Sequence, residues 1–181
     1  MSDSASQELI LLLKDIEQRS RQQVKGLPEQ DDTHGMWEGI FFHIAGTGVV
    51  TAIDEVKEIL NYPSSVTLVP GAKKWLLGIA NIRGNLLPII DLQIFLGGQP
   101  IVVAKRSRVL VIEFQGNQAG LLVGGVQGLR YFSDKKREAI SPLTGPIGQY
   151  VREAFKLEEE TRPIFSMKTL VESTGFQVAA A

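Results

Sequence analysis

The sequence predicts a mainly β protein made of small barrels, and three features of the chain indicate this. From Trp37 onward, short runs rich in β-branched and aromatic residues recur, which is typical of strands. Glycine-containing turns separate these runs. Part of the pattern then repeats further along the chain. Short strands with this spacing favour barrels, because a sheet that closes on itself has no exposed edge.

The N-terminal segment differs from the rest and is predicted to form one amphipathic helix over residues 4–25. Ser4 fits the start of a capping box, and Gly26 is a typical stop. One face of this helix is apolar and consists of Leu9, Leu12, Leu13 and Ile16. This stripe fits either docking on the chain's own barrel or binding to a partner protein. Residues 27–36 are polar and are expected to be a linker, so helix and linker together occupy 1–36.

Six strands are expected after the linker: Gly39–Ala45, Val49–Ile53, Leu76–Ile82, Leu86–Leu92, Arg108–Phe114 and Ala119–Val123. Turns are expected at Gly46-Thr47-Gly48, at Gly116-Asn117 and at Arg83-Gly84-Asn85. In the last of these, Gly84 and Asn85 are the residues that tolerate a positive φ.

Two short helices complete the expected elements, at Leu92–Leu96 and Met167–Ser173. Asp91 stands just before the first of them, where an aspartate caps a turn well. The folded domain is therefore expected to span residues 37–173, and residues 174–181 are expected to be a C-terminal tail.

A shift of 70 residues aligns two parts of the chain. Ile40, Phe42, Ile44 and Gly46 then fall on Leu110, Ile112, Phe114 and Gly116. The same shift places Gly78 on Gly148. Past an apparent insertion, Pro88-Ile89-Ile90 is echoed by Pro163-Ile164-Phe165. Any two apolar hairpins can be aligned by chance, but the shared glycines and the constant offset favour two copies of one β unit.

Arg83 is the residue that most needs an explanation, because it lies in a hairpin of apolar strands. A guanidinium cannot be neutralised, so it must reach solvent, a carboxylate or a partner. One interpretation is an exposed arginine at the hairpin tip. The other is an arginine held by an acid of the same chain, which shapes a surface that another protein reads.

Several spaced residues around this hairpin carry a family resemblance. Asn81-x-Arg83-Gly84 is followed by Pro88-x-x-Asp91-Leu92, and Val56-x-Glu58-Ile59 lies upstream, as do Pro70 and Gly78. Together they closely resemble the CheW-like coupling domain of bacterial chemosensory systems, over roughly residues 37–171. The resemblance implies two intertwined, pseudo-symmetric, SH3-like five-stranded barrels. It also implies a partner-binding surface made of Val56, Glu58, Gly78, Asn81, Arg83 and Gly84.

The resemblance further implies that Glu58 lies near Arg83, and Glu55 is the alternative partner. A carboxylate can accept the planar guanidinium through two hydrogen bonds. Gly124 departs from the family pattern, which usually has an aspartate at that place. Any partner contact that this aspartate makes in relatives is therefore in doubt for this chain.

Composition and motifs argue against catalysis and nucleic-acid binding. The chain has 19 basic and 20 acidic residues, a net charge of -1, and no cysteine. This balance lacks the concentrated positive charge that nucleic acids or anionic membranes attract. The two histidines, His34 and His43, are not at metal-ligand spacing, and no phosphate-binding or nucleophile motif is present. We therefore expect no catalytic residue, no cofactor and no metal site.

Two functional hypotheses follow. The resemblance implies a non-catalytic adaptor between the cytoplasmic tip of methyl-accepting receptors and the regulatory domain of a CheA-type histidine kinase. The N-terminal helix further resembles coupling proteins of systems that control type IV pili and twitching motility. The alternative is a β-barrel that senses a nucleotide or another small molecule. A cytoplasmic location, with recruitment to receptor arrays and no membrane insertion, is expected because no signal or spanning segment is visible.

Overall fold

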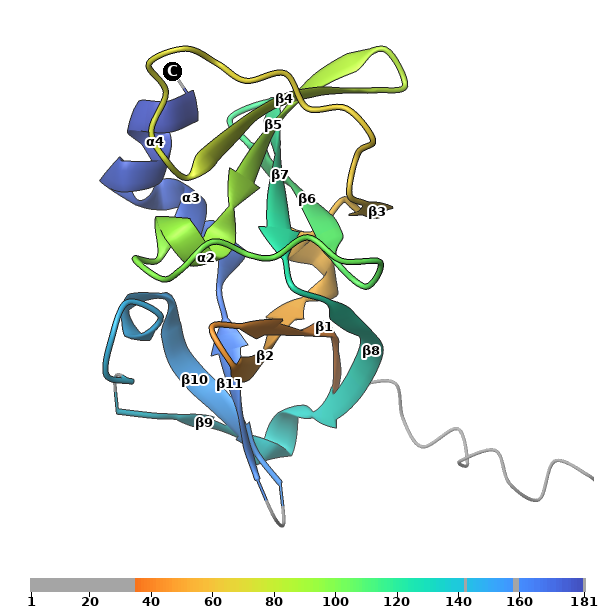
Figure 1. The fold of residues 1–181 in the computed structure, drawn as a ribbon. Coiled ribbons are helices and arrows are strands. Elements are labelled where there is room, and N and C mark those ends of the chain that lie inside the picture. Colours follow the sequence, from red (N-terminus) through yellow and green to blue (C-terminus); the bar gives the residue numbers. More distant parts are fainter. Residues whose placement is uncertain (1–34, 142, 158–159, 181) are drawn as a thin grey trace, which may run out of the picture. The chain divides into compact units, whose positions relative to one another are not determined.

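The computed structural model describes residues 35–141, 143–157 and 160–180, and the helix expected at 4–25 lies outside this range. The described residues form two β-sheets (Figure 1). The first sheet has six strands in the order β8-β1-β2-β11-β10-β9. The second has five strands in the order β3-β6-β7-β5-β4. The mainly β fold class is thus confirmed, although the first sheet has one strand more than expected.

The strands of the first sheet are β1 (Met36–Ile44), β2 (Thr47–Ala52), β8 (Val126–Ser133), β9 (Arg137–Ala139), β10 (Val151–Lys156) and β11 (Thr161–Phe165). Those of the second sheet are β3 (Glu58–Asn61), β4 (Leu76–Ile82), β5 (Asn85–Asp91), β6 (Arg108–Phe114) and β7 (Asn117–Val123). The α-helices are α2 (Leu92–Phe95), α3 (Met167–Glu172) and α4 (Thr174–Ala180). Short 3-10 helices are η1 (Ile53–Glu55), η2 (Asp134–Lys136) and η3 (Gly148–Tyr150).

The two sheets repeat the same strand arrangement, as the offset of 70 residues predicts. In the first sheet β2 pairs in parallel with β11, and in the second β7 pairs in parallel with β5. Each sheet combines strands from both halves of the chain: the β1–β2 hairpin lies with β8–β11, and the β6–β7 hairpin lies with β3–β5. Leu129 of β8 pairs with Ile40 of β1, and Ile59 of β3 pairs with Leu110 of β6, which are positions related by the same offset. The two halves of the chain are therefore intertwined.

Two-residue turns of one geometry join three hairpins, β1–β2, β4–β5 and β6–β7. The residue pairs with positive φ are Ala45 and Gly46, Arg83 and Gly84, and Gln115 and Gly116. Such turns match the twist of the strands that they connect. The expectation that Gly84 and Asn85 would adopt positive φ is therefore wrong by one position. Arg83 has a φ of 52°, and Asn85 is already the first residue of β5.

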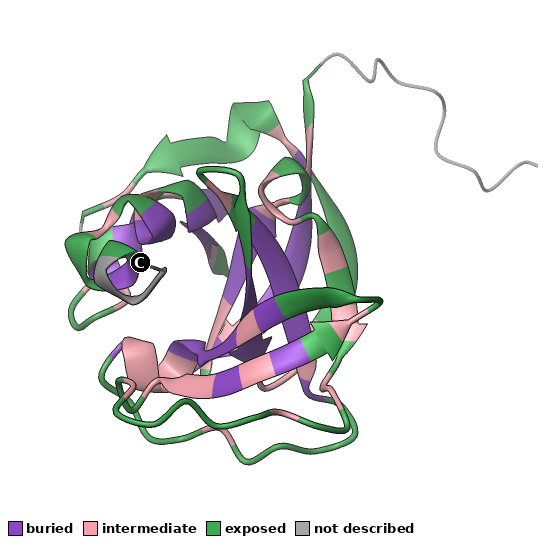
Figure 2. Ribbon diagram, turned by 90° about the horizontal axis from the view of Figure 1, so that it is seen from above, coloured by how far each residue is buried: buried purple, intermediate pink, exposed green. Residues whose placement is uncertain are grey.

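The main core lies between the sheets and draws on both of them. Phe42 of β1, Leu110 of β6 and Phe165 of β11 are fully buried in it. Each sheet also encloses a smaller apolar cluster of its own. In the first sheet, Phe132 of β8 stacks on Phe155 of β10, with ring centroids 4.4 Å apart. Figure 2 shows that most buried positions lie on strands and helices, whereas much of the connecting loops is exposed.

The C-terminal residues add a helix to this core. Residues 174–180, expected as a tail, form α4, and Phe176 is buried against Phe95 and Phe114. Asp91 caps α2 as expected, since its Oδ1 accepts hydrogen bonds from the backbone N–H groups of Gln93 and Ile94. Within the part of the chain that the structure describes, no helix has the length and apolar character needed to span a membrane.

Candidate partner-binding site

The turn between β4 and β5 displays Arg83 on a fixed backbone. The Oδ1 atom of Asn81 accepts a hydrogen bond of 2.8 Å from the backbone N–H of Gly84, which braces the turn from inside. Glycine at the second turn position adopts its positive φ without steric cost. Arginine at the first position does not share this freedom, so Arg83 stands in a conformation that few side chains favour. The Asn-x-Arg-Gly motif thus fixes the backbone at Arg83, and with it the position from which the guanidinium extends.

Arg83 and Glu58 form the ion pair that the family resemblance implies. Nη1 and Nη2 of Arg83 donate to Oε2 and Oε1 of Glu58 at 3.1 and 2.7 Å, so the contact is bidentate. Glu58 begins β3 and Arg83 follows β4, and these are the two border strands of the second sheet. The ion pair therefore connects opposite borders of one sheet, which helps to close it into a barrel.

This ion pair is exposed rather than buried. The side chain of Arg83 is 73% exposed and that of Glu58 is 37% exposed. Exposed pairs of this kind contribute less than about 1 kcal/mol to stability, because water competes for both charges. A partner protein can therefore reach the guanidinium while Glu58 holds it in place.

The remaining predicted site residues differ in how they relate to this pair. Asn81 and Gly84 belong to the same turn and are exposed. Val56 is partly buried against the main core, two residues before Glu58. The structure thus brings Glu58, Asn81, Arg83 and Gly84 together at one end of the second barrel, with Val56 supporting the start of β3.

Gly78 is buried and acts through the backbone. Its φ is +143°, and a Cβ atom at this position would overlap the carbonyl oxygen of Thr67. Thr67 and Ile79 exchange two backbone hydrogen bonds of 2.8 Å each. The missing side chain of Gly78 therefore lets the segment before β4 lie directly against that strand, and Gly78 supports the hairpin rather than facing a partner.

A second ion pair lies beside Glu58 and was not expected from the sequence. The Nζ atom of Lys57 contacts Oε2 of Glu113, and both side chains are exposed. The backbone N–H of Lys57 also donates to the carbonyl oxygen of Val111 at 2.8 Å. These residues meet because β3 pairs with β6, which comes about 50 residues later in the chain. No local sequence pattern predicts that pairing.

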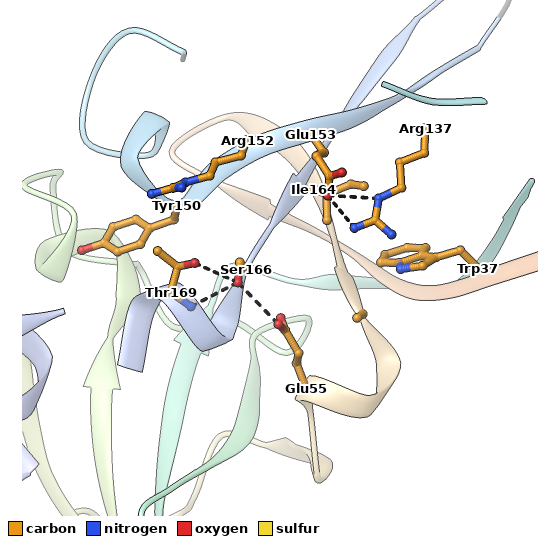
Figure 3. Close-up of a pocket in the computed structure, with 10 residues that line it drawn as sticks. Trp37, Glu55, Arg137, Tyr150, Arg152, Glu153, Ile164, Ser166 and Thr169 are labelled. Atoms are coloured by element: carbon orange, nitrogen blue, oxygen red, sulfur yellow. Dashed lines mark hydrogen bonds and ion pairs between the residues drawn. The ribbon is translucent and has the colours of Figure 1, made fainter. Parts of the chain in front are cut away.

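Glu55, the alternative partner for Arg83, has another role. It lines a cavity of about 250 Å³ beside the first sheet (Figure 3). Its Oε2 accepts hydrogen bonds from the backbone N–H of Met167 at 2.7 Å and from Oγ1 of Thr51 at 3.2 Å. Oγ of Ser166 donates to its Oε1 at 3.4 Å. Glu55 therefore holds the start of α3 to the first hairpin, and its assignment to Arg83 is wrong.

The same cavity contains further polar groups that already bond to one another. Figure 3 shows Arg137 reaching Glu153 above Trp37, with the Nε–Oε2 distance at 3.0 Å. Oγ of Ser166 accepts a hydrogen bond from the backbone N–H of Thr169. Among the described residues, no group of three or more histidine, cysteine, aspartate or glutamate side chains could hold a metal ion.

Comparisons with known proteins identify the family of the chain. The family model described as CheW-like domain matches residues 38–175. The chain is 39% identical over 166 residues to Protein PilI of Pseudomonas aeruginosa, covering 91% of this chain and 92% of that protein. It is 26% identical over 143 residues to a probable chemotaxis protein CheW of Rhizobium etli, covering 78% of this chain and 92% of that protein.

A solved structure supports the same assignment. The scaffolding protein TtCheW from Thermoanaerobacter tengcongensis superimposes with a TM-score of 0.66 at 27% sequence identity. The match covers 77% of this chain and 94% of that one. The family match, the similar sequences and the shared fold agree, and the chain belongs to the CheW-like family.

Proposed function

We propose that the chain is a non-catalytic adaptor that couples methyl-accepting receptors to a CheA-type histidine kinase. Membership of the CheW-like family supports the adaptor role. The similarity to Protein PilI over nearly the whole length of both proteins supports a place in the chemosensory pathway of type IV pili and twitching motility. In this role the protein works in the cytoplasm and joins receptor arrays at the membrane. The alternative of a ligand-sensing domain gains no support from the comparisons.

The exposed, bidentate pair of Arg83 and Glu58 is the observation that carries the proposal. Two hydrogen bonds fix the guanidinium before a partner arrives, so little side-chain entropy is lost on binding. Arginine held in this way is well suited to a protein interface, because its planar face and its remaining N–H groups stay available. We assign this end of the second barrel to the regulatory domain of the kinase.

The receptor is assigned to a different surface, the groove between the two barrels. A cavity of about 560 Å³ lies there, lined by the β1–β2 turn, by the Gly124–Gln127 segment that leads into β8, and by Gln93 and Arg106. The amide of Gln93 links α2 to this turn, since its Oε1 accepts a hydrogen bond of 3.3 Å from the backbone N–H of Ala45. A receptor helix hairpin in this groove would contact both halves of the adaptor at once.

Binding measurements with three purified components test the proposal. The chain should bind the cytoplasmic fragment of a methyl-accepting receptor and, separately, the regulatory domain of a CheA-type kinase from the same bacterium. It should also bind both together, because the two surfaces are distinct. Binding of neither component would refute the adaptor role, and competition between the two would refute the assignment to separate surfaces.

A further inference from the structure

Among the described residues, the border strand β8 has a partner strand on one side only. The strand order places it at one end of the first sheet, next to β1 (Figure 1). Residues 127–131 of β8 are all exposed, and Leu129 and Tyr131 are 42% and 62% exposed. An exposed border presents free N–H and C=O groups and is a ready template for another strand, unless charges, prolines or bulges protect it.

The backbone groups of Leu129 point away from β1. The β1–β2 turn has two residues, so its closing pair, Ile44 and Thr47, is hydrogen-bonded, and bonding alternates from there along β1. Ile40 consequently directs its backbone N–H and C=O groups to β2. Those of its partner on β8, Leu129, therefore point away from β1. The side chain of Arg130 agrees with this, because its Nη1 donates to the carbonyl oxygen of Leu129 at 3.0 Å.

By the same alternation, Tyr131 and Ser133 also direct their backbone groups outward. The regular part of this border is residues 129–133, because a bulge interrupts the β1–β8 pairing near Gly128, which has a φ of 101°. Arg130 carries the only charge in residues 129–133. Its bond to Leu129 is exposed to solvent, so it protects the border only weakly.

A second copy of β8 can pair antiparallel with this border in few ways. A two-fold axis at Arg130 would place two guanidinium groups directly opposite each other, which is unfavourable. An axis at Tyr131 uses all five regular residues, placing Tyr131 opposite its copy and Leu129 opposite Ser133. Arg130 then lies opposite an aromatic residue, Phe132, instead of another arginine. The number of paired residues and the separation of the two arginines therefore both favour the register with the axis at Tyr131.

We propose that β8 is a self-association surface, through which two copies of the chain join their first sheets about a two-fold axis at Tyr131. The pairing is isologous, so each copy supplies the same strand and the contact closes after two chains. Leu129 and Tyr131, which share one face of the strand, become partly covered. The dimer carries two copies of each surface assigned above, although its existence does not depend on those assignments.

Cysteine cross-linking tests both the dimer and its register, because the chain contains no cysteine. In the proposed register the two Tyr131 Cα atoms are about 5.5 Å apart, a separation that a disulfide can bridge. Tyr131→Cys should therefore form a disulfide-linked dimer under mild oxidation. The matched control is Arg130→Cys, whose Cα atoms lie more than about 7 Å from their copies and should not cross-link.

Light scattering of the unmodified full-length chain provides the second readout. The mass should rise with concentration toward twice that of the monomer. Tyr131→Pro should abolish this rise, because proline removes an outward N–H that β1 does not use. A chain that stays monomeric at all concentrations, or cross-linking of Arg130→Cys in place of Tyr131→Cys, would overturn the proposal. A dimer that appears only after residues 1–34 are deleted would also overturn it, since the full chain would then cover its own border.

Discussion

Arg83 and Glu58 come from opposite borders of the second sheet, yet their side chains meet in a bidentate ion pair. The contact exists because the sheet curls until β3 approaches the β4–β5 turn. Leu60 of β3 and Ala80 of β4 pack into the same apolar cluster, which is independent support for this closure. The ion pair thus marks the seam of the barrel, where a partner can reach it.

A double-mutant cycle measures the strength of this pair. Arg83→Ala and Glu58→Ala should each lower the free energy of unfolding by less than about 1 kcal/mol, because both charges are exposed. The double variant should lose less than the sum of the single losses, since the residues are coupled. Denaturant unfolding gives the three values. Fully additive losses would show that the pair does not form in solution.

Gly78 and Gly84 offer a comparison between crowding and backbone strain. Both have positive φ, but only Gly78 has a neighbour where a Cβ atom would stand. Gly84→Ala should cost about 1 kcal/mol from strain alone. Gly78→Ala should cost clearly more, because the carbonyl of Thr67 must also move. Equal losses on thermal unfolding would refute the close approach, and a Gly78→Trp variant that still binds both partners would remove Gly78 from the site.

Tyr131 should titrate at a higher pH than a free tyrosine. A hydrogen bond to the carboxylate of Glu38 and the negative charge of that carboxylate raise the pKa of Tyr131 above 10.0. The neutral phenol is the form that donates to Glu38, so the interaction is present below the ordinary pKa and is lost as the pH rises above it. Glu38→Gln should bring the pKa back toward 10. An NMR titration that finds the same pKa in both proteins would contradict this contact.

The apolar stripe expected at Leu9, Leu12, Leu13 and Ile16 lies outside the described residues and stays a prediction. If the stripe docks on the chain's own barrel, deleting residues 1–30 should lower the melting temperature and expose a dye-binding apolar patch. An unchanged melting temperature together with the loss of one partner would instead assign the helix to an interface.

The hairpins and their motif were predictable because their signals are local. The bounds of β4 and β6 agree with the expected ones, since both strands carry β-branched residues between clear turns. The β8 strand was missed because most of its residues are exposed and give no apolar alternation, and β3 has only four residues. The placement of these two strands depends on pairing between remote segments. That pairing brings Lys57 beside Glu113, a contact that no local pattern contains.

Part of the candidate site was predictable because its motif is also local in the sequence. The pairing of Arg83 with Glu58 followed from the family resemblance, whereas their exposure depends on how the barrel closes and needed the structure. The positive φ of Arg83 was missed because arginine rarely adopts it, and glycine and asparagine were the natural choices. Glu55, the alternative partner for Arg83, instead accepts hydrogen bonds from Thr51, Ser166 and Met167, and the last two lie more than 100 residues away, where no local pattern indicates the contact.

Calorimetric titration of the kinase regulatory domain into wild-type protein and two variants tests whether Arg83 is the point of contact with the kinase. Arg83→Ala should lose binding while its unfolding stays close to wild type. The control is Arg137→Ala, which breaks another exposed arginine–glutamate pair, that with Glu153 in the first barrel, and should bind normally. Undiminished binding by a folded Arg83→Ala protein would contradict the claim that this guanidinium is the point of contact with the kinase.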